Sequence, residues 1–233
     1  MSPAAKPATR ECVVLLHGLI RTAQSMKKLE TRLIKEGYTV INVNYPSRKH
    51  SIEELAKIAV EQGIRECRTR GCTTIHFVTH SLGGILVRLY LKNHACDDIG
   101  RVIMLGPPNQ GSEIVDRLKH MRAFKLVNGP AGQQLGTRTS DIPGSLGRVN
   151  FELGVIAGTR HANPLLSVYL PKPHDGKVSV ASTRTEGMTD FLTLPTMHSF
   201  MMRNEAVIEQ TVSFLKHGRF KHGHQTPDDK RAG

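Results

Sequence analysis

The chain has 233 residues, a length that suits one domain, and 39% of them are hydrophobic on a count that omits glycine, as in ordinary globular proteins. No stretch approaches the roughly 20 apolar residues that cross a bilayer, and residues 1–10 lack the apolar core of a secretory signal. The formal net charge is +12, but the basic residues are scattered, aromatic residues make up only 5% and Trp is absent, so we do not expect nucleic-acid binding.

The missing signal predicts a cytoplasmic protein, and export with a signal already removed stays open. A basic surface also leaves open a weak association with an anionic membrane surface, and nothing in the sequence indicates an oligomeric state. The four cysteines, Cys12, Cys67, Cys72 and Cys96, include no CxxC pair, so a metal knuckle or a redox dithiol is not expected. We expect buried reduced thiols, with a Cys67–Cys72 bridge as the alternative in an exported protein.

Short apolar runs alternate with amphipathic stretches in the first half of the chain. Ser51 has the signature of a helix N-cap, with Glu54 as its capping-box partner. The β-α-β-α-β-α-β order predicts a parallel sheet with helices on both faces and with the carboxyl ends of the strands along one edge. The pattern predicts strands at 12–16, 38–43, 73–79 and 101–105, and helices at 22–36, 51–68 and 82–94.

The alternation breaks between Gly106 and Asn150, where Gly, Pro, Asn and Ser are frequent and one helical patch is predicted near 114–127. Apolar residues such as Met121 and Phe124 favour a cap or pocket wall at about 107–150 over disorder. Strands at 151–157 and 191–194 and a helix at 204–216 then complete a single domain over 11–216. We expect residues 1–10 and 217–233 to be flexible termini.

Ser81 lies between a predicted buried strand and a predicted helix, in the segment Thr79-His80-Ser81-Leu82-Gly83-Gly84. A serine on such a sharp strand-to-helix turn projects its hydroxyl above the sheet, which is the context of a nucleophile elbow. The glycines after it let the helix approach the strand closely. Thr79 stands where the usual motif has glycine, so the fit to G-x-S-x-G is incomplete.

A serine hydroxyl needs a base, and in hydrolases with this turn the acid and then the histidine follow the serine along the chain. His198 follows the final predicted strand and should emerge at the same edge as Ser81. Asp175, before the turn glycine of the segment His174-Asp175-Gly176, is the leading acid. Asp190 and Glu186 are its rivals, although Asp190 begins the final strand and so lies nearer the opposite edge.

An oxyanion formed at Ser81 needs two N–H donors. One is the backbone N–H of the residue after the serine, Leu82. The other is expected in the loop after the first strand, His17-Gly18-Leu19-Ile20, where the glycine lets the Leu19 N–H turn toward the site.

Together these motifs resemble the bacterial lipase/esterase-like α/β hydrolases, near the triacylglycerol lipases and the GPI-inositol-deacylase-like (PGAP-type) group. The resemblance spans about residues 11–216 and implies an α/β-hydrolase fold: a mostly parallel sheet of about six strands, helices on both faces and a small cap insertion. It also implies a triad of Ser81, Asp175 and His198 with oxyanion amides at Leu19 and Leu82. The matching segments are 16–19 (LHGL), 80–84 (HSLGG), 106–112 (GPPNQGS) and 175–178 (DGKV), with His198.

The short cap favours an esterase of short or medium acyl chains over a long-chain lipase. We therefore expect a serine hydrolase that cleaves small-molecule or lipid carboxylic esters and requires no cofactor and no metal. An acyltransferase or thioesterase with the same triad is the first alternative, and a binding protein without catalysis is the second.

Overall fold

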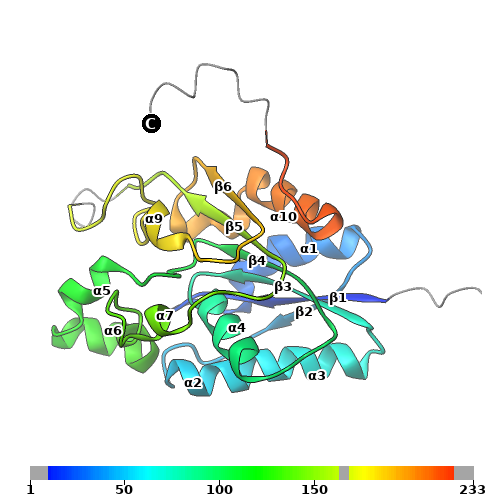
Figure 1. The fold of residues 1–233 in the computed structure, drawn as a ribbon, viewed down its shortest axis with the longest axis horizontal. Helices are drawn as coiled ribbons and strands as arrows, with labels where there is room; N and C mark the ends of the chain where they lie inside the picture. The colour runs from blue at the N-terminus through cyan, green and yellow to red at the C-terminus, as the bar shows by residue number, and fades with distance from the viewer. Residues whose placement is uncertain (1–9, 163–167, 223–233) are drawn as a thin grey trace, which may run out of the picture.

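The sheet of this protein has six strands in the order β2-β1-β3-β4-β5-β6, and every neighbouring pair is parallel. The computed structural model describes residues 10–162 and 168–222 (Figure 1). The predicted parallel sheet of about six strands is therefore confirmed. Its strands are β1 (Glu11–Leu16), β2 (Thr39–Val43), β3 (Thr74–His80), β4 (Ile99–Leu105), β5 (Leu153–Gly158) and β6 (Asp190–Leu194).

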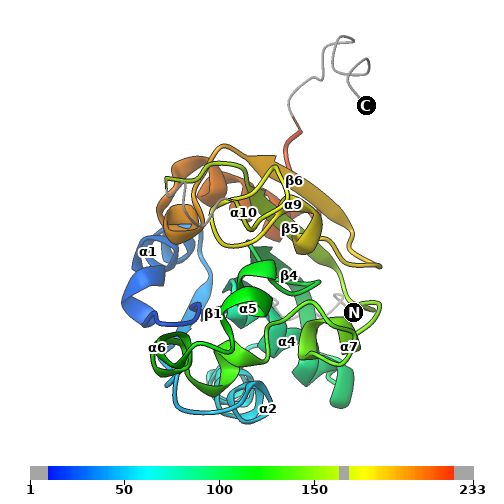
Figure 2. The same cartoon turned by 90° about the vertical axis from the view of Figure 1, so that its left-hand side faces the viewer.

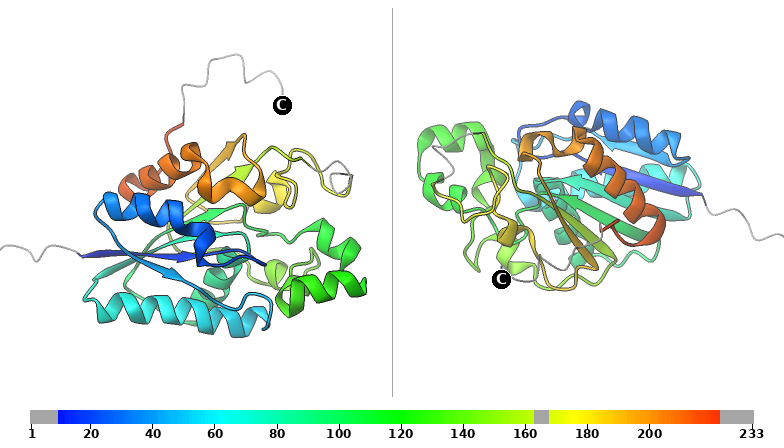
Figure 3. Two further views of the ribbon diagram at one scale, coloured as in Figure 1. Left: turned by 180° about the vertical axis from the view of Figure 1, so that it is seen from behind. Right: turned by 90° about the horizontal axis from the view of Figure 1, so that it is seen from above.

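Both faces of the sheet are covered, which explains the nearly continuous apolar runs of its strands. In β1, Val13 and Leu15 pack on one side, whereas Val14 and Leu16 pack on the other. Helices α1 (Lys27–Lys35) and α10 (Glu205–His217) cover the first face, seen together in Figure 3. The second face is covered by α2 (Ile52–Leu55), a π-helical turn (Ala56–Glu61), α3 (Gln62–Thr69) and α4 (Leu82–Asn93).

The helices begin where the sequence predicts, with small differences. Ser51 caps α2, and its hydroxyl accepts from the Glu54 N–H in a complete capping box. The predicted helix over 22–36 is divided into a 3-10 turn (Ala23–Met26) and α1. Among the described residues, no helix has both the length and the apolar character of a bilayer span.

The segment between β4 and β5 lies over the carboxyl ends of the strands, as Figure 2 shows by looking onto that edge. It contains α5 (Glu113–Leu118), α6 (Arg122–Gln133) and α7 (Ile142–Ser145). The single helical patch expected near 114–127 is thus two helices, and α6 kinks at Gly129, whose φ is 65°. A further short helix, α9 (Val180–Thr183), precedes β6.

The expectation of a flexible end from residue 217 is wrong for Phe220, which is buried and packs its ring against Phe214. The Phe220 N–H donates to Asp190 Oδ2 at 2.7 Å, and His222 Nε2 lies 2.8 Å from Asp190 Oδ1. The carboxylate at the start of β6 therefore anchors this part of the chain. Residues 1–9 and 223–233 of the expected termini, 1–10 and 217–233, lie outside the described residues.

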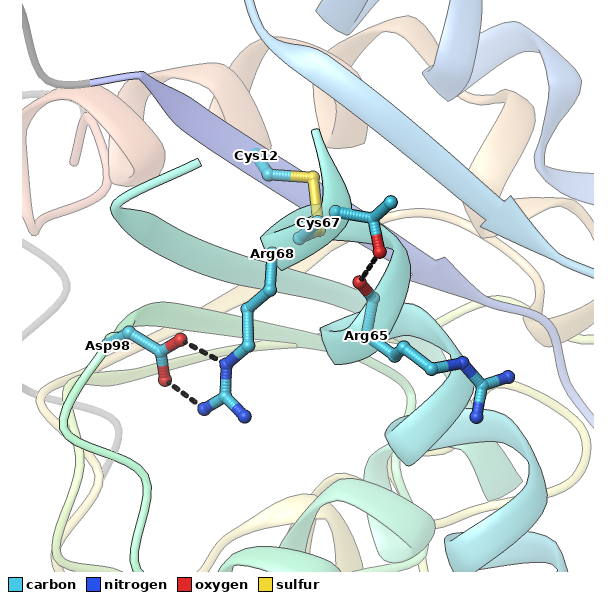
Figure 4. The surroundings of a disulfide bond; sticks show 6 residues. Cys12, Arg65, Cys67, Arg68 and Asp98 are labelled. Carbon is cyan, nitrogen blue, oxygen red and sulfur yellow. Dashed lines mark hydrogen bonds and ion pairs between the residues drawn. A yellow bond between two sulfur atoms is a disulfide. The ribbon is translucent and has the colours of Figure 1, made fainter. Parts of the chain in front are cut away.

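The cysteines differ from the prediction. Cys12 of β1 and Cys67 of α3 form a disulfide with a Cα–Cα distance of 6.0 Å (Figure 4). Neither four reduced thiols nor a Cys67–Cys72 bridge is found, and Cys72 and Cys96 are free. The two bonded residues are separated by 55 positions in the sequence, and the packing of α3 on β1 brings them together. Sequence spacing alone does not carry that information.

Candidate active site

Ser81 occupies the turn between β3 and α4 with φ 52° and ψ −117°. Within the described parts of the chain, Ile20 is the other residue besides glycine with positive φ. Such a backbone conformation is strained for an L-residue and persists where the surrounding structure enforces it. The turn leaves Ser81 partly exposed, although its neighbours His80 and Leu82 are buried.

Close packing around this turn explains its glycines. A Cβ on Gly83 would lie 2.8 Å from the Leu16 carbonyl oxygen, so α4 approaches β1 as only glycine allows. Thr79 is fully buried, and its hydroxyl donates to the Ile103 carbonyl at 3.3 Å. The structure thus accommodates the threonine at the position where the motif usually has glycine, because β4 offers an acceptor.

His198 follows β6 and begins a 3-10 turn (His198–Arg203). Its Nδ1 lies 2.7 Å from Asp175 Oδ2, and both side chains are almost completely buried. A carboxylate only accepts hydrogen bonds, so Nδ1 carries the proton and Nε2 is left to accept. The His198 N–H also donates to the Asp175 carbonyl at 3.0 Å.

The other carboxylate oxygen of Asp175 is equally constrained. Oδ1 accepts from the backbone N–H groups of Lys177 at 2.9 Å and Val178 at 2.8 Å. The rivals lie in other interactions: Glu186 pairs with Arg148 at 2.7 Å, and Asp190 binds the chain around Phe220. Of the three acids considered from sequence, the structure brings Asp175 to His198.

Gly106, directly after β4, makes room for this pair. A Cβ there would lie 3.0 Å from Asp175 Oδ2 and 3.1 Å from His198 Nδ1, and the residue has φ +56°. A side chain at this position would therefore meet both strain and a clash.

A cavity of about 320 Å³ lies between the carboxyl edge of the sheet and the segment that contains α5 and α6. Ser81 and His198 both line it, and so does Leu19. The segment expected to be a pocket wall does form one side, with apolar residues Ile114, Val115, Leu118, Phe124, Val127 and Leu135.

The loop after β1 runs beside Ser81, because β1 and β3 are adjacent strands. A Cβ on Gly18 would lie 3.2 Å from Ser81 Cβ. Within the described residues the Leu19 N–H has no acceptor, whereas the Ile20 N–H donates to Ser47 Oγ at 3.2 Å. Leu82 is the first residue of α4, so its N–H has no partner within the helix. Two N–H donors therefore remain near Ser81.

His17 fixes the backbone of this loop through hydrogen bonds and through stacking on Tyr45. The Tyr45 N–H donates to His17 Nε2 at 3.3 Å, so Nδ1 carries the proton and donates to the Gly18 carbonyl at 2.9 Å. The two rings stack at 4.0 Å, and the Tyr45 hydroxyl donates to the His17 carbonyl. Burial lowers the pKa of His17, which keeps the ring neutral.

The fold of this chain is similar to that of solved structures. No protein-family model matches the sequence, and no curated protein matches it. The mature lipase BlEst2 of Bacillus licheniformis is 18% identical with a TM-score of 0.67, and the match covers 91% of each chain. A lipase-esterase related protein from Clostridium acetobutylicum is 13% identical with a TM-score of 0.59, covering 89% of this chain and 95% of its own. The chain has the α/β-hydrolase fold.

Phospholipase PlaB from Legionella pneumophila is similar over a smaller part. It is 20% identical with a TM-score of 0.61, and the match covers 75% of this chain and 45% of PlaB.

In this α/β-hydrolase fold the strand order sets the positions of the candidate residues. Leu19 follows β1, Ser81 follows β3 and His198 follows β6, so all three reach the same edge of the sheet.

In this α/β-hydrolase fold His80 contacts His198, a role that the sequence analysis did not predict. Its Nε2 lies 3.0 Å from the His198 carbonyl oxygen and therefore donates, and its ring centroid is 4.8 Å from that of His198. Its Nδ1 is buried without a hydrogen-bond partner. Burial, reinforced by the charges of His198 and Arg21, lowers the pKa of His80 well below 6.5. A neutral His80 thus fixes the backbone of His198, and its place next to Ser81 in the sequence was the available signal.

Proposed function

We propose that the protein is a serine hydrolase that cleaves carboxylic esters of short to medium acyl chains through an acyl-enzyme on Ser81. The observation that carries this proposal is the buried pair of His198 and Asp175, which adjoins the same cavity as the strained turn of Ser81. The solved structures with this fold include proteins described as lipases and a phospholipase, which is consistent with an ester substrate.

In the proposed mechanism, Ser81 Oγ attacks the ester carbonyl carbon while His198 Nε2 takes the hydroxyl proton. Asp175 holds the imidazole in the required tautomer and stabilises its positive charge. The N–H groups of Leu19 and Leu82 donate to the oxyanion. His198 then gives the proton to the leaving alkoxide, and a water molecule attacks the acyl-enzyme in the same way to release the acid and restore Ser81.

The apolar side of the cavity suits the acyl chain. Side chains of Ile114, Val115 and Leu118 face it from α5, and Phe124 faces it from α6. Burial of each methylene stabilises a bound acyl chain by about 0.8 kcal/mol. A volume of about 320 Å³ limits how much chain is buried, so the proposal is an esterase of short to medium chains.

Replacement of Ser81 by Ala tests the proposal. We expect Ser81→Ala to abolish turnover of p-nitrophenyl butyrate and labelling by a fluorophosphonate probe, with an unchanged melting temperature. Ser145→Ala, at an exposed position of α7, is the matched control and should behave as the wild type. Unchanged turnover in Ser81→Ala would exclude the assigned nucleophile.

We further propose that the protein works in an oxidising compartment and not in the cytoplasm expected from the sequence. The Cys12–Cys67 disulfide supports this, because cytosolic thiols are kept reduced. Weak binding of the basic surface to anionic membranes stays a prediction, checked by sedimentation with anionic and neutral liposomes.

A further inference from the structure

The candidate active-site cavity contains two cations and, among the described residues, no carboxylate lines it. Arg21 comes from the turn after β1, and Lys177 comes from the loop that carries Asp175. They belong to different segments and line the same cavity as Ser81. Two cations at the border of a cavity whose lining is mostly apolar attract an anionic ligand.

Neither cation is neutralised by the protein. Within residues 10–162 and 168–222, Arg21 and Lys177 take part in no ion pair, and neither side chain donates a hydrogen bond. Asp175 is the acid nearest to Lys177 in the chain, but its two oxygens already accept from His198 and from backbone N–H groups. The positive charges are therefore left for a ligand.

The electrostatics of Lys177 agree with this geometry. The residue is exposed by surface area, but partial desolvation is the largest cause that lowers the pKa of Lys177. The charge of Arg21 lowers this pKa further, and Asp175 opposes the shift. Both cations line one cavity, and an anion bound between them would interact favourably with both.

The positive charge continues outward from the site. A second cavity, of about 650 Å³, shares Ile20 and Arg21 with the first and is also lined by Arg48 and Lys49. No described carboxylate lines this cavity either. A concave surface of one sign of charge attracts ligands of the opposite sign.

The position of the apolar side chains in the cavity indicates which part of the substrate carries the anionic group. The acyl chain takes the side of the cavity lined by α5 and α6, where an anionic group would have to lose its water without a partner. Arg21 lies instead on the side shared with the second cavity. An anion bound there belongs to the alcohol part of the ester.

We propose that Arg21 and Lys177 bind an anionic group on the alcohol side of the ester, so that the substrate is an anionic amphiphile such as an acyl ester of a glycerol phosphate. This inference rests on the proposed function. The acyl chain lies against α5 and α6, the carbonyl meets Ser81, and the anionic group lies between the two cations.

A matched pair of substrates tests the inference: monodecanoylglycerol and decanoyl glycerol phosphate, both below their micellar concentrations, with decanoate release as the readout. We expect the wild type to prefer the phosphate ester, and added KCl to reduce the preference. Arg21→Gln and Lys177→Gln should each lower the ratio of kcat/KM, anionic over neutral, by about tenfold, since each removes a charge-assisted hydrogen bond.

Arg65→Gln and Lys57→Gln remove the same charges from exposed positions on α3 and the π-helical turn and should keep the wild-type ratio. The orientation of Arg65 away from the disulfide region is visible in Figure 4. Equal kcat/KM for the two esters, or a ratio unaffected by Arg21→Gln and Lys177→Gln, would overturn the inference while leaving the proposed hydrolase intact.

Binding gives a readout that does not depend on turnover. Calorimetric titration of Ser81→Ala with decanoyl glycerol phosphate should show binding that weakens about tenfold when Arg21→Gln is added. If neither ester is hydrolysed, the proposed function fails, and this titration alone decides the inference. Equal affinity for the neutral and the anionic ester in Ser81→Ala would then overturn it.

Discussion

Asp175 and His198 are joined twice, through a 2.7 Å contact between Oδ2 and Nδ1 and through a 3.0 Å backbone hydrogen bond. The double attachment fixes both the position and the tautomer of the imidazole. We expect Asp175→Asn to lower kcat for p-nitrophenyl butyrate by roughly 10³-fold or more, because an amide favours the wrong tautomer of His198. Asp190→Asn, at the start of β6, should keep its turnover. Equal losses in the two variants would contradict the assignment of Asp175.

Gly106 is expected to be required for activity. Gly106→Ala places a methyl group 3.0 Å from Asp175 Oδ2 and 3.1 Å from His198 Nδ1, and it also strains a residue with φ +56°. We expect a loss of about 1–2 kcal/mol of stability and a large loss of turnover. Gly71→Ala is a matched control, since Gly71 has φ +70° but no atom within 4 Å of the added Cβ. It should lose similar stability and keep its activity, as measured by urea unfolding and ester hydrolysis.

Acid should destabilise the fold through buried histidines. Burial lowers the pKa of His17, His76 and His80 below 6.5, so below that pH the unfolded chain binds more protons than the folded one. The free energy of unfolding therefore decreases as the pH falls below 6.5, which is the pKa of a histidine in the unfolded chain. Above that pH the stability contributed by the neutral rings is fully present.

His76 provides the test, because it is far from the candidate site and accepts from the Arg101 N–H at 2.8 Å. His76→Gln keeps an acceptor and cannot titrate, so its loss of stability between about pH 7.5 and about pH 5.5 should be smaller than that of the wild type. His120→Gln, at an exposed position, should follow the wild type. Identical pH dependence in His76→Gln and the wild type would contradict a role of the buried His76 ring in acid destabilisation.

The disulfide should contribute strongly to stability. It closes a loop of 55 residues, for which the chain-entropy account gives about 4 kcal/mol. We expect dithiothreitol, or Cys12→Ser, to lower the urea midpoint of the wild type substantially. Cys96→Ser, which removes a free thiol, should leave the midpoint unchanged. An unchanged midpoint after full reduction would refute this role of the disulfide.

Local patterns in the sequence were sufficient for the elements of this fold. Apolar runs predicted all six strands to within two residues, and the capping box of Ser51 was found as expected. The order of the motifs predicted Ser81, Asp175 and His198 as site residues, because chain order and a parallel sheet together determine which loops meet at one edge. The structure brings Asp175 to His198, and Ser81 and His198 line one cavity. The strands and the capping box are encoded within short windows of sequence.

The features that sequence reasoning missed depend on contacts between distant segments. Three such contacts join residues that no sequence periodicity relates. They are the disulfide of Cys12 with Cys67, the hydrogen bond of Phe220 with Asp190 and the hydrogen bond of His80 with the His198 backbone. Ile20 differs in kind: its φ of 60° opposes the preference of a β-branched residue, so local rules predict the wrong conformation there.

The segment that contains α5, α6 and α7 connects the end of β4 to the start of β5, and these two strands are immediate neighbours in the sheet. The register of the two strands, from Val102 with Leu153 to Leu105 with Ile156, involves no residue of this segment. The pairing of β4 with β5 is thus independent of this segment, which under the proposed function carries the side chains that contact the acyl group. The first residues of this segment are an exception, because Gly106 adjoins Asp175 and His198, and Ser112 Oγ donates to the Lys177 carbonyl in the loop that carries Asp175. Under the proposed function, exchange of the residues after Ser112 should change the preferred acyl group and leave Ser81, Asp175 and His198 in place.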